Sequence, residues 1–256
     1  MTKDQHEKIW VSGSPKMWRR HPAGSRQCSG CHQPLVERII ADVVEELDIA
    51  GDTIIVTGVG CSSRMALPIQ VDSVLSPHGR APDVATGIKR MLKGRPIVMT
   101  LQGDGDCASI GAGSLINAAM RSEKITVVML NNTNYGMTGG QLSPTSLMEQ
   151  TTTTTPTGRS EEFGYPAHIP ELLVAVKGVS YAARSSVHNP AEYQKTKRYL
   201  KNALTTQINR LGLSFLEIIV ACPSDWHMTP IEALDFIKEN ILSEFPLGEF
   251  KKASSL

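Results

Sequence analysis

Residues 102–141 decide the fold. They open with Gly103-Asp104-Gly105-Asp106 and later reach Asn131-Asn132-Thr133-Asn134-Tyr135-Gly136, with an apolar strand expected at 125–130. Because the carboxyl ends of parallel strands meet at one edge of a sheet, where α/β proteins bind ligands, the aspartate and the asparagines should converge. A carboxylate, an amide oxygen and a backbone carbonyl suit a Mg²⁺ that keeps its other positions for phosphate and water. Two tight turns with Gly and Asn at positive φ are the alternative, and the coherent spacing of ligands favours the metal site.

Composition excludes several classes of function. The 256 residues are 41% hydrophobic and 20% charged, and the formal net charge is +1. This balance gives no bulk electrostatic case for binding nucleic acid or an acidic membrane. The polar N-terminus lacks a secretory signal, and no apolar run is long enough to span a bilayer. We therefore expect a cytoplasmic protein whose five cysteines are thiols or metal ligands rather than disulfides.

Apolar runs alternate with helical patterns along the chain. We expect an N-terminal arm at 1–27 containing Trp10 and Trp18, one domain at 28–250, and a short tail at 251–256. Strands are expected at 53–57, 96–101, 125–130, 179–184 and 213–220, and helices at about 34–47, 82–92, 109–120, 170–176, 190–209 and 230–242. Residues 64–77 are expected to be irregular. About five strands separated by helices indicate an α/β fold with a doubly wound, mainly parallel sheet.

Residues 136–168 form a long segment rich in Gly, Thr, Ser and Pro. A loop of this length inside a compact domain is usually functional or disordered. Because its start continues the expected metal site, we interpret it as a cofactor and substrate loop. No G-x-G-x-x-G follows a strand near the N-terminus, which disfavours a nicotinamide-binding Rossmann protein.

Four cysteines are expected at or near the same sheet edge. Cys28 and Cys31 form a C-x-x-C pair, while Cys61 and Cys222 each follow the end of a strand. Four converging thiolates could hold a 4Fe–4S cluster or a structural Zn²⁺. A C-x-x-C pair alone also fits a redox dithiol. Cys107 is expected to be a small buried apolar residue.

The spacing of these motifs resembles a known family. Gly103-Asp104-Gly105, 25 residues, then Asn131-Asn132 resembles the thiamine diphosphate motif of thiamine-dependent enzymes. The longer string through Gly140-Gln141 resembles the β subunit of 2-oxoacid:ferredoxin oxidoreductases, and the resemblance runs from about Cys28 to Lys251. The strings Thr152-Thr153-Thr154-Thr155-Pro156, Gly164-Tyr165-Pro166, Cys222-Pro223-Ser224-Asp225-Trp226 and Phe245-Pro246-Leu247-Gly248 look closest to the branched-chain (2-oxoisovalerate) members. Members specific for 2-oxoglutarate or pyruvate share the main motifs. One departure is His32-Gln33-Pro34, where the family usually has Gly-His-Gly.

The resemblance implies a role for each matching residue. Asp104, the Asn132 side chain and the Asn134 carbonyl would bind Mg²⁺. Thiamine diphosphate would be bordered by Gly60, Ser62, Gly103, Gly105, Asp106, Tyr135, Gly136, Met137 and Thr138. The implied catalytic residues near the reacting carbon and the substrate are His78, Arg80, Thr138 and Gln141. Arg80 would pair with the substrate carboxylate or form a structural salt bridge. Cys28, Cys31, Cys61 and Cys222 would ligate a 4Fe–4S cluster close to the thiamine.

The implied activity is oxidative decarboxylation of a 2-oxoacid to acyl-CoA and CO₂, with electrons passing through the cluster to ferredoxin. In the family, a pyrimidine-domain (α) subunit supplies the glutamate that activates the cofactor. The isolated chain is therefore expected to be inactive, and to assemble with the α subunit and with γ and ferredoxin-like subunits. Residues 108–119 are candidates for that contact. The alternatives are half of a non-oxidative thiamine enzyme with zinc on the cysteines, or a non-catalytic scaffold subunit.

Overall fold

The computed structural model describes residues 15–18 and 27–253. Of the tryptophans in the expected arm, Trp10 lies outside the described residues, whereas Trp18 packs against the core beside α2 and forms a bridge with Ile69. The principal helices are α2 (Gln33–Glu46), α3 (Ala81–Met91), α4 (Ala112–Met120), α5 (Ile169–Val174), α6 (Pro190–Ile208), α7 (Pro223–Trp226), α8 (Pro230–Phe236) and α9 (Leu242–Glu244). The strands are β1 (Thr53–Thr57), β2 (Asp72–Leu75), β3 (Ile97–Gly103), β4 (Thr126–Asn131), β5 (Asn134–Tyr135), β6 (Gln141–Leu142), β7 (Val179–Ser186), β8 (Leu213–Ile219) and β9 (Gly248–Lys251).

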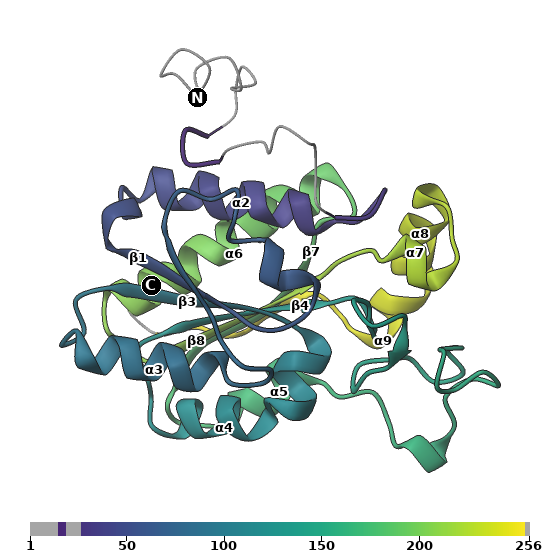
Figure 1. The fold of residues 1–256 in the computed structure, drawn as a ribbon. Coiled ribbons are helices and arrows are strands. Elements are labelled where there is room, and N and C mark those ends of the chain that lie inside the picture. Colours follow the sequence, from purple (N-terminus) through teal and green to yellow (C-terminus); the bar gives the residue numbers. More distant parts are fainter. Residues whose placement is uncertain (1–14, 19–26, 254–256) are drawn as a thin grey trace.

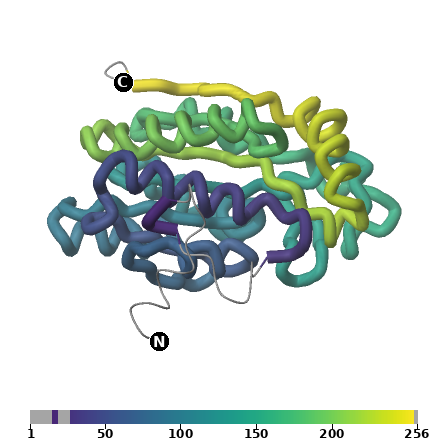
Figure 2. The backbone as a smooth tube through the Cα atoms, turned by 90° about the horizontal axis from the view of Figure 1, so that it is seen from above, coloured from purple at the N-terminus to yellow at the C-terminus, as the bar shows by residue number. Residues whose placement is uncertain are grey.

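The strands form a seven-stranded sheet in the order β2-β1-β3-β4-β8-β7-β9. All neighbours are parallel except β9, which pairs antiparallel with β7. Helices α2 and α6 cover one face, and α3, α4 and α5 cover the other (Figure 1). Seen from above, the C-terminal segment runs along one edge of the molecule (Figure 2). The doubly wound, mainly parallel α/β fold expected from the sequence is confirmed.

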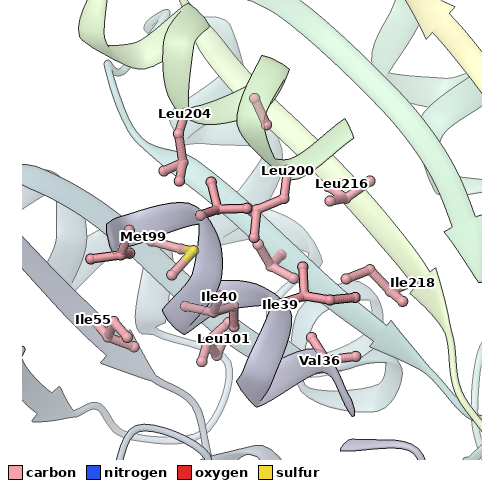
Figure 3. Packing of buried hydrophobic residues seen from close by; sticks show 14 of the residues in the cluster. Val36, Ile39, Ile40, Ile55, Met99, Leu101, Leu200, Leu204, Leu216 and Ile218 are labelled. Atoms are coloured by element: carbon pink, nitrogen blue, oxygen red, sulfur yellow. The ribbon is translucent and has the colours of Figure 1, made fainter. Parts of the chain in front are cut away.

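Strand residues alternate between two hydrophobic cores, one on each face of the sheet. Ile55 and Val128 point into the core with α2 and α6, while their neighbours Val56 and Val127 point into the core with α3, α4 and α5. Figure 3 shows α2 packing against the strands through Val36, Ile39 and Ile40 and other apolar residues. Strands that are buried on both faces read as continuous apolar runs, which is why the central ones are recognisable in the sequence.

Several elements differ from the expectation. Strands β2 and β9 were not expected; they form the two edges of the sheet, and all residues of β2 are exposed. Residues 64–77, expected to be irregular, therefore contain a strand. The helix expected at 109–120 is a π-helical turn, Asp106–Ile110, followed by α4 after Gly111. The helix expected at 230–242 is likewise α8, a π-helical segment at Ile237–Ile241, and α9.

Candidate active site

Three oxygen atoms converge where β3 and β4 end. Asp104 follows β3 directly, and Asn132 follows β4. The Asn132 side-chain oxygen lies 3.1 Å from Asp104 Oδ1 and 3.1 Å from the Asn134 carbonyl oxygen. None of these atoms carries a hydrogen, so either the amide is rotated to donate to its neighbours or a cation lies between the oxygens. Mg²⁺ binds oxygens at 2.0–2.1 Å in octahedral geometry, which places adjacent ligands about 3 Å apart. The arrangement therefore fits Mg²⁺.

The Asp104 carboxylate is held in place from one side. It is almost fully buried, and its Oδ2 accepts hydrogen bonds from the Ser143 hydroxyl at 2.6 Å and from the Thr145 hydroxyl. These bonds leave Oδ1 facing Asn132. Burial raises the pKa of Asp104 to about 6, and a cation nearby would favour the ionised form. The two hydroxyls belong to the long loop after β6 and were not assigned to the metal site from the sequence.

The Asp106 carboxylate accepts hydrogen bonds from three segments of the chain rather than facing open space. Its Oδ1 accepts hydrogen bonds from the Gly79 backbone N–H at 2.8 Å and the Val59 N–H at 3.3 Å, and its Oδ2 accepts one from the Gln102 amide at 2.6 Å. A Cβ atom at Gly58 would lie 1.9 Å from Asp106 Oδ2, so only glycine fits there. The carboxylate thus fixes the loop after β1 and the loop before α3 beside the metal site.

Two residues expected on the substrate side lie in the loop that Asp106 holds. His78 Nδ1 is 3.4 Å from Asp106 Oδ1, and the imidazole stacks on the Tyr135 ring with centroids 6.3 Å apart. Arg80 points to the helices instead: it donates to the Ser114 hydroxyl at 3.0 Å and lies 3.6 Å from Asp83. In this structure Arg80 therefore makes the structural ion pair, and its pairing with a substrate carboxylate stays a prediction.

The segment that follows Gly136 is open to solvent. Thr138 donates from its hydroxyl to the Gln141 side-chain oxygen, and the Gln141 amide donates to the Thr138 carbonyl at 2.8 Å. Met137 is exposed next to them. On the other side of the site, the Ser62 hydroxyl is buried and has no hydrogen-bond partner among the described residues. A buried hydroxyl without a partner fits a polar ligand, as expected beside Gly60.

The four cysteines assigned as ligands line one pocket. It holds about 430 Å³ of empty space, including its open mouth, and its wall contains Cys28, Cys31, Cys61, Cys222, Asn132, Gly136 and Asp225 among others. The C-x-x-C turn closes with a hydrogen bond from the Cys31 N–H to the Cys28 carbonyl at 3.1 Å. The His32 N–H approaches the Ala221 carbonyl at 3.5 Å, which places this turn beside Cys222.

Burial makes three of these thiols harder to ionise. Burial raises the pKa of Cys31 to about 12, and it also raises the pKa of Cys61 and of Cys222. Among the described residues, no three His, Cys, Asp or Glu side chains already surround a point where an ion could bind. Ligation therefore requires the thiols to lose their protons and turn toward one centre. Cys107 differs from them: as expected, it is buried in the core under α4.

The metal site and the cysteine pocket share a wall at Gly136. A Cβ atom there would lie 3.2 Å from the Asn132 amide nitrogen, 3.5 Å from Cys222 Sγ and 3.0 Å from an Asp225 carboxylate oxygen. The Trp226 indole N–H also donates to the Asn132 carbonyl at 3.1 Å. The segment after β8 therefore contacts the metal site directly.

Comparisons with known proteins agree with this geometry. Residues 58–218 match the family model "Thiamine pyrophosphate enzyme, C-terminal TPP binding domain". The chain is 38% identical over 235 residues to ketoisovalerate oxidoreductase subunit VorA of Methanothermobacter marburgensis, covering 91% of this chain and 49% of that protein. It is 35% identical over 213 residues to 2-oxoglutarate synthase subunit KorB of Archaeoglobus fulgidus, covering 83% and 75%. The chain thus spans about half the length of the VorA relatives.

A solved structure is similar over almost the whole chain. The 2-oxoglutarate:ferredoxin oxidoreductase from Magnetococcus marinus, with 2-oxoglutarate, coenzyme A and succinyl-CoA bound, has a TM-score of 0.79 and 27% identity, covering 95% of this chain and 86% of that chain. Among the described residues, no helix has the length and apolar character needed to cross a membrane. The chain carries a thiamine diphosphate-binding domain and belongs to the family that includes the VorA and KorB subunits of 2-oxoacid:ferredoxin oxidoreductases.

Proposed function

We propose that this chain is the thiamine diphosphate-binding subunit of a CoA-acylating 2-oxoacid:ferredoxin oxidoreductase. The overall reaction would convert a 2-oxoacid and CoA to an acyl-CoA and CO₂, while two electrons reduce ferredoxin. The observation that carries the proposal is the shared wall at Gly136, which brings a three-oxygen metal site and a four-cysteine pocket into contact. A non-oxidative thiamine enzyme needs the first site only, whereas an oxidative one needs an electron acceptor beside it.

Some of the site residues would bind the cofactors, and others would position the groups that react. Asp104, Asn132 and Asn134 would hold Mg²⁺, which in turn would hold the diphosphate. The cysteines at positions 28, 31, 61 and 222 would ligate a 4Fe–4S cluster. When bound, thiamine diphosphate supplies the carbanion chemistry, and the protein orients it and sets its electrostatics. His78 would face the substrate from the loop that Asp106 fixes.

A branched-chain substrate, 2-oxoisovalerate, is the first choice. Two relatives with 38% and 37% identity are named ketoisovalerate oxidoreductase subunits, and the strings around Thr152–Pro156 and Cys222–Trp226 look closest to that type. The alternative is 2-oxoglutarate, because KorB relatives reach 37% identity and the similar solved structure contains that acid. Pyruvate is a third candidate within the same family.

Partner subunits would complete the site. The family model that the chain matches is the C-terminal TPP-binding domain alone, and the relatives are themselves named as subunits. We propose a pyrimidine-domain (α) subunit that supplies the activating glutamate, together with γ and ferredoxin-like subunits. Ferredoxin would be the final electron acceptor.

The test uses the complex purified with its partner subunits. Turnover of 2-oxoisovalerate, 2-oxoglutarate and pyruvate is measured with CoA and a one-electron acceptor, and iron and acid-labile sulfide are determined. We expect CoA-dependent reduction of the acceptor, fastest with 2-oxoisovalerate, and four irons per chain in excess of those on the ferredoxin-like subunit. A colourless complex with zinc on the cysteines would refute the oxidoreductase assignment. Unchanged turnover in Asp104→Ala would instead identify a scaffold subunit.

A further inference from the structure

A buried ion pair joins the neighbouring strands β7 and β8, away from the residues assigned to the cofactors. Arg184 on β7 and Glu217 on β8 are neighbours in register, and both side chains are fully buried. Arg184 Nε donates to Glu217 Oε2 at 2.8 Å, and the two terminal nitrogens of the guanidinium donate to Glu171 at 2.8 Å each. Desolvating two charges in this way is expensive, and an apolar pair would usually be at least as stable. The presence of this buried ion pair therefore needs an explanation other than a gain in stability.

The second oxygen of Glu217 leads from this pair to the end of β4. Glu217 Oε1 accepts a hydrogen bond from the Asn131 side-chain amide at 2.6 Å. The Asn131 side-chain oxygen in turn accepts one from the Thr133 backbone N–H at 3.0 Å. All three residues are fully buried. Because Glu217 fixes which end of the Asn131 amide is the donor, the oxygen end must face the Thr133 N–H.

Thr133 has a backbone conformation that needs such support. Its φ of 58° lies in the left-handed region, which is rare for a β-branched residue. The Gln150 amide donates to the Thr133 hydroxyl at 3.0 Å, and the Ser146 hydroxyl donates to the Thr133 carbonyl. The sharp turn at Thr133 directs both the Asn132 side-chain oxygen and the Asn134 carbonyl toward Asp104. Without the turn, those two oxygens would not share one centre.

We propose that Glu217, itself oriented by Arg184, is a positioning residue for the metal site: through Asn131 it holds the turn that presents two of the three metal-facing oxygens. This inference rests on the metal site of the proposed function. Glu217 touches neither the cofactor nor the metal ligands. Its effect should therefore appear in metal affinity, because partners behind metal ligands typically change affinity by 10- to 100-fold when they are removed.

The experiment compares three variants in the purified complex. Binding of thiamine diphosphate is titrated with Mg²⁺, and with Mn²⁺ followed by electron paramagnetic resonance, while unfolding is measured in parallel. Glu217→Leu removes the acceptor for Asn131, whereas Glu217→Gln keeps one acceptor oxygen for the two donors, Asn131 and Arg184. The matched control is Gln207→Leu. Gln207 is equally buried, and it forms hydrogen bonds with Val98 and Thr126. These two residues lie at the N-terminal ends of β3 and β4, whereas the metal site lies at the C-terminal ends of the same strands.

We expect Glu217→Leu to weaken binding of either metal by at least tenfold, and Glu217→Gln to weaken it less than Glu217→Leu does. Gln207→Leu should lower the unfolding temperature without changing metal affinity. Equal changes of affinity in Glu217→Leu and Gln207→Leu, or wild-type affinity in Glu217→Leu, would overturn the proposal. If Glu217→Leu does not fold, Asn131→Ala leaves the Arg184–Glu217 pair intact and should show the same loss of affinity; wild-type affinity there would overturn it.

The two hypotheses fail in different ways. If the wild-type complex binds thiamine diphosphate with Mg²⁺ but oxidises no 2-oxoacid, the proposed function is wrong while the role of Glu217 still stands on the affinity data. If the wild type turns over and the Glu217 variants match it in metal affinity, only the positioning role is refuted.

Discussion

Gly105 lies against the Tyr135 ring, and substituting it by alanine should damage the metal site. The backbone does not require glycine here, because its φ of −63° and ψ of −38° are ordinary helical values. The obstacle is the ring: a Cβ atom at Gly105 would lie 2.2 Å from Tyr135 Cε1 and 2.3 Å from its Cζ. The ring must retreat by about 1 Å before the contact becomes tolerable, since overpacked groups relax by shifting.

That shift reaches the metal ligands within one residue. Tyr135 directly follows Asn134, whose carbonyl faces the Asn132 side chain. The Tyr135 hydroxyl donates a hydrogen bond to the Gly105 carbonyl at 3.1 Å. We expect Gly105→Ala to lower the free energy of unfolding by about 1–3 kcal/mol through overpacking. We also expect Mg²⁺-dependent binding of thiamine diphosphate to weaken by about 10- to 100-fold. Urea unfolding and calorimetric titration of the complex measure the two effects.

Two further variants separate this explanation from a general loss of stability. Gly87→Ala in α3 places a Cβ atom where no atom lies within 4 Å, so it should stabilise the helix by about 0.5–1 kcal/mol and leave binding unchanged. In the Tyr135→Ala background, Gly105→Ala should cause no additional loss, because the ring is gone. The reasoning is refuted if Gly105→Ala binds like the wild type, or if its effect is equally large without the ring.

Four other outcomes follow from single contacts. Asp104→Asn should weaken Mg²⁺ binding at least about 100-fold in the same titration, because it removes the only charged member of the oxygen set; a smaller loss would place the metal elsewhere. Cys31→Ser should lower the iron content of the complex while Mg²⁺ affinity stays near that of the wild type. Arg159→Met should destabilise the loop around 143–165 by about 3 kcal/mol and speed its proteolysis, since the buried guanidinium donates to the Gly164 and Tyr165 carbonyls at 2.8 Å each. Burial lowers the pKa of Lys89 to about 8; this amine therefore binds more protons in the unfolded chain between pH 8 and 10, and the free energy of unfolding of the wild type should rise over that window relative to that of Lys89→Met.

The central strands could be predicted because both of their faces are buried. β1, β3, β4 and β8 are almost wholly buried, and their sequences show it as predominantly apolar runs. The edge strands could not be predicted in this way. β2 has the sequence Asp-Ser-Val-Leu and all four of its residues are exposed, so no burial pattern marks it. Its strand conformation comes from pairing with β1, a tertiary contact that local sequence does not encode.

The same distinction applies to the site. The convergence of Asp104 and Asn132 follows from strand order, so a parallel sheet was sufficient to predict it. The hydroxyls of Ser143 and Thr145 reach Asp104 from a loop whose path depends on Arg159 and its backbone partners. Loop paths of this kind are fixed by long-range hydrogen bonds rather than by periodicity, and nothing local indicates them.

The contact between the metal site and the cysteine pocket is a property of the sheet itself. β4 and β8 are parallel neighbours, and their last residues pair in register, Asn131 with Ile219. Asn132 follows β4 directly and Cys222 lies three residues after Ile219, so both leave the sheet at the same edge. A Cβ atom at position 136 would lie 3.2 Å from the Asn132 amide nitrogen and 3.5 Å from Cys222 Sγ, so a side chain there would contact both groups. Under the proposed function, an electron acceptor beside the thiamine site would thus require no additional strand or helix: Cys61 and Cys222 follow strands of the sheet, and Cys28 and Cys31 come from the turn before α2.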